Sequence, residues 1–254
     1  MEQRILRKLN TTKMKYWERK EKLFKYIDGV RQFFPLAQEQ LETISRIIDK
    51  YNPSIDSFLD LGCGDGFFGR FVYELYPDSK GVFLDISQEM INKVKEKSLK
   101  DSTEYIVQDF GKDGWESSIK SIEKFDLIIS GFSIHHIESD TKRRLYKDIY
   151  NLLQPQGIFL NLEHVSSPTE KIEELFNDLF LDGMSDYQES IKEKKTKEEI
   201  KNLYHDPNHK KLNKLESVEK QCVWLREIGF EDVDCFMKIF ELALFGGIKN
   251  AKNY

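Results

Sequence analysis

The chain has few cysteines, and their spacing forms no metal-binding pattern. Its three cysteines, Cys63, Cys222 and Cys235, lie far apart and include no CxxC pair, which argues against the common zinc and iron–sulfur sites. We therefore expect free thiols in a reducing compartment, and no metal.

The sequence also lacks long apolar runs and any excess of positive charge. No run approaches the roughly 18–20 apolar residues of a membrane span, and the polar, basic start differs from a signal peptide. The formal net charge of −5 argues against a broad nucleic-acid-binding surface. We expect a cytoplasmic, one-domain protein outside the membrane; its oligomeric state stays open, with a homodimer as one option.

From residue 56 onward, short apolar runs alternate with amphipathic segments. The predicted strands are 56–61, 80–87, 103–110, 124–130 and 156–165, and helical patterns separate them. Nearly continuous apolar strands joined by helices indicate a parallel sheet covered on both faces. The runs 231–240 and 242–250 can pair as an antiparallel hairpin. We therefore expect an α/β, Rossmann-like, seven-stranded, mostly parallel sheet whose last strand is antiparallel.

The pattern divides the chain into four segments. They are an N-terminal helical segment (1–50), the α/β core (51–165), a helical insertion (166–215), and a helix with a hairpin that completes the sheet (216–254). Because the first and third segments take no part in the predicted sheet, we expect them to form a helical lid over the ligand.

The stretch FLDLGCGDGFFG, residues 58–69, predicts a strand that ends in a glycine turn. Within it, GDGFFG matches the dinucleotide fingerprint G-x-G-x-x-G. Counted from Gly62, the first glycine after the strand, the third glycine position is Phe67. The match is therefore out of place for a dinucleotide.

Charge also separates the ligands that such a turn could hold. A pyrophosphate docks on a helix N-terminus, where Asp60 and Asp65 would each repel it by about 4 kcal/mol at 4 Å and an effective dielectric near 20. S-adenosylmethionine carries a sulfonium and an ammonium instead, so the same carboxylates would attract it. Glycines would let either ligand approach the backbone closely.

Two more acids end the next strands. Asp85 stands where a carboxylate accepts hydrogen bonds from ribose hydroxyls, and Asp109 could accept from an adenine amino group while Phe110 or Ile86 packs on the ring. Either acid could instead be a helix N-cap. Three acids at the carboxyl ends of successive strands favour a ligand crevice.

The motifs DLGCGDG, FLDIS, VQDF and FDLIISGFSIHHI, followed by IYNLLQPQGIFLNLEH, resemble the class I S-adenosylmethionine-dependent methyltransferases over residues 55–165. The closing segment resembles the ending of small bacterial and archaeal methyltransferases. More distantly, it is similar to the carboxy-S-adenosylmethionine-using tRNA wobble-uridine enzymes, although Ala37 stands where that family has a tyrosine.

The resemblance implies a cofactor site made of strand ends and the turns that follow them. It implies S-adenosylmethionine as cofactor and S-adenosylhomocysteine as product. The implied contacts are Asp60, Gly62, Cys63, Gly64 and Gly66 for the turn and the methionine part, Asp85 and Ile86 for ribose and adenine, Asp109 and Phe110 for adenine, and Ser130 and Gly131 beside the sulfonium.

Histidines supply the candidates for proton transfer. His135 and His136 follow the fourth strand; His135 is our candidate base, because imidazole suits proton removal near pH 7. The alternative is a structural histidine bonded to nearby backbone. His205 and His209 are four residues apart, but Pro207 interrupts any helix that would align them, so we expect no metal site.

Three functions fit these residues. The first is a methyltransferase that acts on a small molecule. The second is a tRNA- or RNA-modifying methyl- or carboxymethyltransferase, and the third is a non-catalytic module that binds S-adenosylmethionine. A nicotinamide dehydrogenase is the remaining competitor, and titration with S-adenosylhomocysteine and with NAD would separate it.

Overall fold

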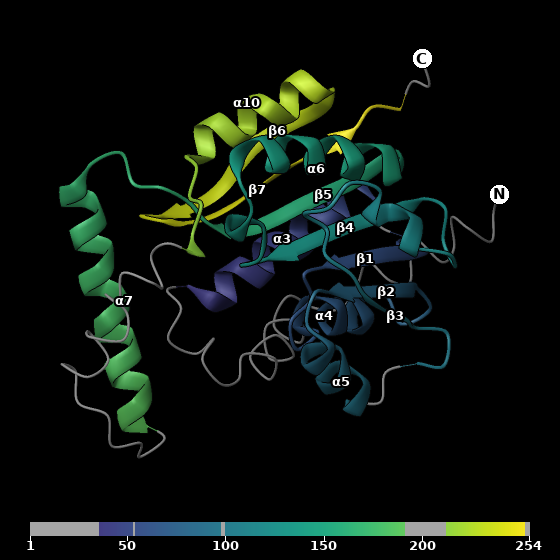
Figure 1. The fold of residues 1–254 in the computed structure, drawn as a ribbon, viewed down its shortest axis with the longest axis horizontal. Coiled ribbons are helices and arrows are strands. Elements are labelled where there is room, and N and C mark those ends of the chain that lie inside the picture. The colour runs from purple at the N-terminus through teal and green to yellow at the C-terminus, as the bar shows by residue number, and fades with distance from the viewer. Residues whose placement is uncertain (1–35, 53, 98–99, 191–211, 252–254) are drawn as a thin grey trace.

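The computed structural model describes residues 36–52, 54–97, 100–190 and 212–251 (Figure 1). Seven strands form one sheet in the order β3-β2-β1-β4-β5-β7-β6. The strands are β1 (Ser57–Leu61), β2 (Lys80–Asp85), β3 (Glu104–Val107), β4 (Phe125–Gly131), β5 (Leu153–His164), β6 (Phe230–Ile239) and β7 (Leu242–Lys249).

The directions of the strands confirm the predicted topology. β1 to β5 pair in parallel, and β7 is antiparallel to its neighbours β5 and β6. The strand order reverses between β1 and β4, which is where open α/β sheets bind ligands at their carboxyl edge. The fold is therefore the expected Rossmann-like sheet with its last strand antiparallel.

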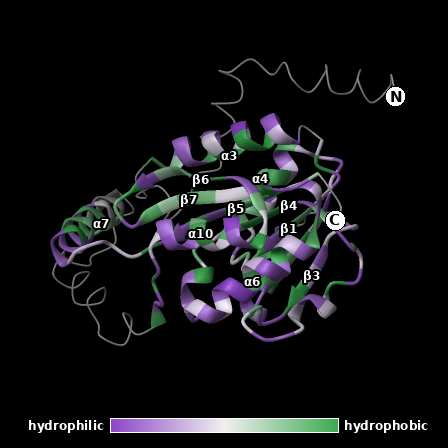
Figure 2. Cartoon of the chain, turned by 90° about the horizontal axis from the view of Figure 1, so that it is seen from above, coloured by the Kyte–Doolittle hydropathy of each residue, from purple (hydrophilic) through white to green (hydrophobic). Residues whose placement is uncertain are grey.

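Helices cover both faces of the sheet (Figures 1 and 2). The helices α3 (Ala37–Tyr51), α4 (Phe67–Leu75) and α5 (Gln88–Glu96) share one core with the sheet, while α6 (Ser139–Leu152) and α10 (Val218–Ile228) share the other. Two short 3-10 turns, η2 (Trp115–Ser118) and η3 (Ile134–His136), flank β4. The helix α7 (Glu170–Ser190) stands at the carboxyl edge, away from these layers.

Local signals explain where α10 begins and ends. The Ser217 hydroxyl accepts from the Lys220 N–H, and Gly229 takes the left-handed conformation that stops the helix. Serine before a helix and glycine after it are the usual local signals for these boundaries.

The fifth strand starts earlier than predicted. The expected strand begins at residue 156, whereas β5 begins at Leu153 and includes the residues LQPQG, 153–157. The pairing with β4 shifts register between Phe125 and Leu127, and Gln156 has a φ of 63°. A strand irregularity at this point accommodates residues that otherwise resemble turn formers.

The predicted lids lie largely outside the described residues. Only 36–50 of the N-terminal segment is described, and of the insertion 166–215 the residues 191–211 are not. The domain boundaries and the lid role therefore stay predictions.

The β5–β7 contact generates a stability prediction. A methyl group on Gly246 would lie 2.0 Å from the Phe159 carbonyl oxygen, whereas one on Gly114 would meet nothing within 4 Å. We expect Gly246→Ala to lower the free energy of unfolding by about 3 kcal/mol through overpacking, and Gly114→Ala by about 1 kcal/mol through its positive φ alone. Urea unfolding measures both; equal losses would contradict the packing argument.

Candidate active site

The carboxylate of Asp60 caps helix α4 from beneath the glycine turn. Asp60 is 1% exposed, and its Oδ2 accepts from the Gly69 N–H at 2.7 Å. The N-cap residue itself, Gly66, has no side chain to do this, so a carboxylate from β1 meets the positive end of the helix dipole. This burial does not support Asp60 as a direct cofactor contact, which stays a prediction.

The carboxylate of Asp85 joins two turns at the carboxyl edge. Its Oδ2 accepts from the Gly64 N–H and its Oδ1 from the Ser87 N–H, both at 2.8 Å. It therefore fixes the turn of residues 62–66, which we call the cofactor turn, to the turn after β2. A carboxylate oxygen has more than one lone pair, so Asp85 retains acceptor capacity for ribose hydroxyls.

Two glycines of the cofactor turn have different reasons to be glycine. A methyl group on Gly62 would lie 2.2 Å from the Ser133 Oγ, so the turn needs glycine to approach the loop after β4. At Gly64, a methyl group would meet nothing within 4 Å. Open space lies there, directly beside the Asp85 carboxylate that bonds its N–H.

Four other predicted contacts pack against the protein itself. Gly66 has a φ of 78° and lies against Val94, and Gly131 lies against the Phe68 ring. Ser130 is fully buried and donates to the Leu61 carbonyl at 2.8 Å. Burial, and then the charges of Asp60 and Asp85, raise the pKa of the Cys63 thiol, which keeps it protonated. These residues shape the turn and the end of β4, and their contact with a cofactor stays a prediction.

The predicted adenine contacts lie after β2 and β3. Ile86 is 64% exposed, and Asp109 accepts from the Gly111 N–H at 2.8 Å. The Phe110 ring is buried against the Gly62 position. Val107, which the sequence analysis missed, is also exposed; its alternation with buried Ile106 on β3 could have indicated this.

The carboxylate of Asp65 is neutralised within the protein. It pairs with Lys97 at 2.8 Å and with Arg70 at 3.8 Å. The sequence predicts that the Asp65 carboxylate repels a pyrophosphate. This cause is wrong, because Lys97 and Arg70 already compensate the charge of Asp65. The stronger obstacle to a phosphate is Asp60, which occupies the N-terminal amide of Gly69 that an anion would use.

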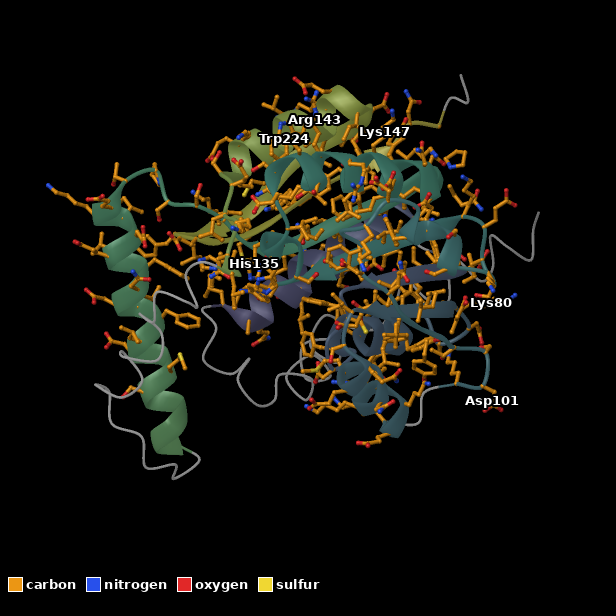
Figure 3. The ribbon with its side chains drawn as sticks, viewed as in Figure 1. Lys80, Asp101, His135, Arg143, Lys147 and Trp224 are labelled. Atoms are coloured by element: carbon orange, nitrogen blue, oxygen red, sulfur yellow. The ribbon has the colours of Figure 1, made fainter. Side chains whose placement is uncertain are left out.

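His135 and Glu163 form a buried pair beside the end of β4. The ring Nδ1 of His135 lies 2.6 Å from the Glu163 Oε1. The backbone N–H of His135 donates to the Glu163 Oε2 at 3.0 Å. Because a carboxylate only accepts, Nδ1 carries the proton and Nε2 is the basic nitrogen. Figure 3 shows His135 at the carboxyl edge, far from Lys80 and Asp101 at the opposite edge.

Glu163 is fully buried yet ionised. Burial alone would raise the pKa of its carboxyl, but the charge of His135, the hydrogen bond from His135 and the His164 N–H at 2.8 Å outweigh burial and lower it. Glu163 is not among the residues predicted from the sequence, although an acid ending the fifth strand follows the same pattern as Asp85 and Asp109.

A second imidazole–carboxylate pair adjoins the first. The Nε2 of His164 lies 2.7 Å from the Glu241 Oε2, and Glu241 is 3% exposed. The His164 ring centroid is 5.7 Å from that of His135 and 5.5 Å from that of Phe176 in α7. This pair is not among the features predicted from the sequence, because its members come from β5 and from the β6–β7 turn.

Within the part of the chain that is described, no group of three or more His, Cys, Asp or Glu could hold a metal ion. His205 and His209 lie outside these residues. No helix in the described ranges is long and apolar enough to cross a membrane.

The sheet order and the cofactor turn define a class: α/β proteins that hold an adenosyl ligand at the carboxyl edge. Residues 59–159 match the family model of a methyltransferase domain. This match and the curated relatives support a class I S-adenosylmethionine-dependent methyltransferase, as the sequence motifs predict.

The two relatives described next are distant in sequence. The chain is 30% identical over 128 residues to malonyl-[acyl-carrier protein] O-methyltransferase 2 of Ilyobacter polytropus, a match over 50% of this chain and 46% of that protein. It is 24% identical over 229 residues to carboxy-S-adenosyl-L-methionine synthase of Shewanella piezotolerans, over 87% of this chain and 88% of that one. The match thus spans less than half the length of the O-methyltransferase.

A solved structure shares the fold. The CurJ carbon methyltransferase superposes with a TM-score of 0.59 at 16% identity, covering 90% of this chain and 57% of that chain.

The residues of the carboxyl edge fit S-adenosylmethionine, the cofactor of this superfamily. The open space at Gly64 and the spare acceptor capacity of Asp85 suit its methionine and ribose parts, and Ile86 and Val107 offer apolar surface to adenine. When bound, this cofactor supplies a methyl group on a sulfonium, with a neutral thioether as leaving group.

Two aspartates should respond differently to substitution. We expect Asp85→Ala to weaken S-adenosylhomocysteine binding by about 1.5–3 kcal/mol, the scale of hydrogen bonds to a charged group. Asp65→Ala should change it by less than about 1 kcal/mol, because Asp65 belongs to a surface ion-pair cluster. Titration calorimetry measures both. Unchanged affinity in Asp85→Ala would remove Asp85 from the site.

The lowered pKa of Glu163 predicts a pH-dependent stability. Its ionised form faces His135, two backbone N–H groups and the charge of Lys142. The stability that it contributes is present above the ordinary glutamate pKa of about 4.3 and is lost as pH falls through the lower folded value. In urea unfolding, the gap between wild type and Glu163→Gln should shrink below about pH 4; a gap that widens on acidification would contradict this assignment.

Proposed function

We propose that the protein transfers a methyl group from S-adenosylmethionine to a small-molecule acceptor whose nucleophilic atom must first lose a proton. The observation that carries this proposal is the buried His135–Glu163 pair at the end of β4. A methyl transfer to an already basic nitrogen or sulfur would need alignment but no base. A base oriented by a buried carboxylate suits an oxygen or carbon acid.

The roles of the two residues follow from their bonds. Glu163 holds the Nδ1–H tautomer, so Nε2 of His135 accepts the acceptor's proton. The imidazolium that forms then lies 2.6 Å from a carboxylate whose lowered pKa keeps it ionised. The pair therefore places an anion beside the cation that the proton transfer creates.

The acceptor class rests on supporting observations. The chain is acidic overall, with a formal net charge of −5, which favours a small acceptor over nucleic acid. Its O-methyltransferase relative bears a name that specifies oxygen as the methylated atom, in agreement with a base-requiring acceptor. A cytoplasmic location and the homodimer option stay predictions from the sequence.

A second candidate function is supported by a relative that the chain matches over most of its length. The likeness to carboxy-S-adenosyl-L-methionine synthase spans 88% of that protein, whereas the O-methyltransferase match spans 46% of its counterpart. In this alternative, the chain would modify the cofactor itself. Mass spectrometry of the ligand that co-purifies with the protein separates the two, because a carboxylated adenosyl sulfonium would favour the second.

The base role predicts a separation of binding from turnover. We expect His135→Ala and Glu163→Gln to lower the rate of methyl transfer by about 10²–10⁴-fold, the usual contribution of a general base. Both should keep S-adenosylhomocysteine affinity within about threefold, a difference under about 1 kcal/mol. Transfer of labelled methyl groups to a panel of phenols, carboxylic acids and 1,3-dicarbonyls measures the rate.

Arg143→Gln is the matched control, because Arg143 pairs with Glu227 on the outer side of α6 and lies away from His135 in Figure 3. It should leave the transfer rate unchanged. Tight S-adenosylhomocysteine binding without transfer to any acceptor class would overturn the proposal in favour of a non-catalytic binding module. Full activity in His135→Ala would overturn the base role.

A further inference from the structure

The pair His164–Glu241 presents a second oriented imidazole at the same edge of the sheet. Its members meet through Nε2 of His164 and Oε2 of Glu241 at 2.7 Å. Because the Glu241 carboxylate can only accept, Nε2 carries a proton. The remaining nitrogen is Nδ1, for which the described residues offer no hydrogen-bond partner.

The Nδ1 of His164 can serve a ligand whether the ring carries one proton or two. Glu241 is 3% exposed, and its side chain bonds His164 within the described part of the chain. With a single proton, at Nε2, the ring accepts from a ligand hydroxyl at Nδ1; with two, its Nδ1–H donates to a ligand oxygen.

The position of the ring matches the acceptor side of the site. The centroids of His135 and His164 are 5.7 Å apart, with the ring planes at 68°, so one small ligand can reach both. The centroid of the Phe176 ring of α7 lies 5.5 Å from that of His164. The His164 side chain retains 16% of its exposure, more than the 9% of His135.

A purely structural role explains less of this arrangement. The β5–β7 ladder already joins these strands through seven residue pairs, from Ile158↔Ile248 to His164↔Leu242. The Val165 N–H also donates to the Glu241 carbonyl at 2.8 Å. The backbone of the β6–β7 turn is therefore fixed without the side chains, and an ion pair there adds little that the ladder lacks.

We propose that His164, oriented by Glu241, binds a second oxygen of the acceptor next to the atom that His135 deprotonates. This inference rests on the proposed function, because it needs His135 to face the acceptor. It narrows the acceptor to molecules that carry an acidic O–H or C–H group and a second oxygen two or three bonds away. Ortho-diphenols and 1,3-dicarbonyl compounds both have this chemistry.

Two substitutions of His164 separate binding from structure. In His164→Gln, the amide Nε2 replaces the imidazole Nε2, so the contact with Glu241 is kept and the group at Nδ1 is lost. In His164→Asn, the amide Nδ2 replaces the imidazole Nδ1, so a donor toward the ligand is kept and the contact with Glu241 is lost. A structural role makes Asn the harmful change, whereas acceptor binding makes Gln the harmful one.

The probes are two matched pairs: catechol with phenol, and pentane-2,4-dione with butanone. Calorimetry in the presence of saturating S-adenosylhomocysteine measures their binding, and thermal unfolding monitors the fold. We expect the wild type to bind at least one two-oxygen probe about tenfold tighter than its one-oxygen partner, as one added hydrogen bond can provide. The pair that shows this preference distinguishes a diphenol from a dicarbonyl acceptor.

The variants decide the assignment. We expect His164→Gln to keep the wild-type melting temperature but to lose the preference, and His164→Asn to keep part of the preference despite a lower melting temperature. The opposite order, or a wild type that binds no probe or shows no preference, overturns the inference. A wild type that transfers methyl groups without any preference defeats only this inference, whereas one with the preference but no transfer to any acceptor defeats the proposed function.

Discussion

Three carboxylates that accept backbone N–H groups hold the carboxyl edge of this sheet together. Asp60 holds the first turn of α4, Asp85 joins the cofactor turn to the turn after β2, and Glu163 fixes η3 through the His135 N–H. Each anion sits at a strand end, where the backbone would otherwise leave unpaired donors. The geometry of the cofactor turn, of the turn after β2 and of His135 depends on these bonds, because these residues lie in the segments that the three carboxylates fix.

This constraint also decides which ligand the edge suits. An anion would compete with Asp60 for the helix terminus, whereas a ligand with hydroxyl and cationic groups can use the remaining lone pairs of Asp85. The edge therefore discriminates against an anionic ligand because the helix N–H group that such a ligand would need already donates to Asp60. This discrimination does not come from bare negative charge, because Lys97 and Arg70 neutralise Asp65.

On the acceptor side of the site, carboxylates likewise fix the groups next to them, which here are the two imidazole rings. Glu163 and His164 are neighbours on β5, and successive residues of a strand point to opposite sides. One contributes the carboxylate that orients His135, and the other contributes a ring oriented by Glu241. A single strand end thus places two oriented imidazoles within 5.7 Å of each other, and Phe176 of α7 covers one of them.

The sequence alone determined the sheet and its helices, because hydrophobic period, glycine turns and caps such as Ser217 are local signals. It also predicts a site at the carboxyl edge, with Asp85 and His135 among its residues because they end strands or follow them. Only the tertiary structure decided what these side chains bond. Asp60 reaches Gly69, Asp65 reaches Lys97, and His164 meets Glu241 from 77 residues away. Such pairings depend on which strand ends and turns become neighbours in space, and no local pattern encodes that.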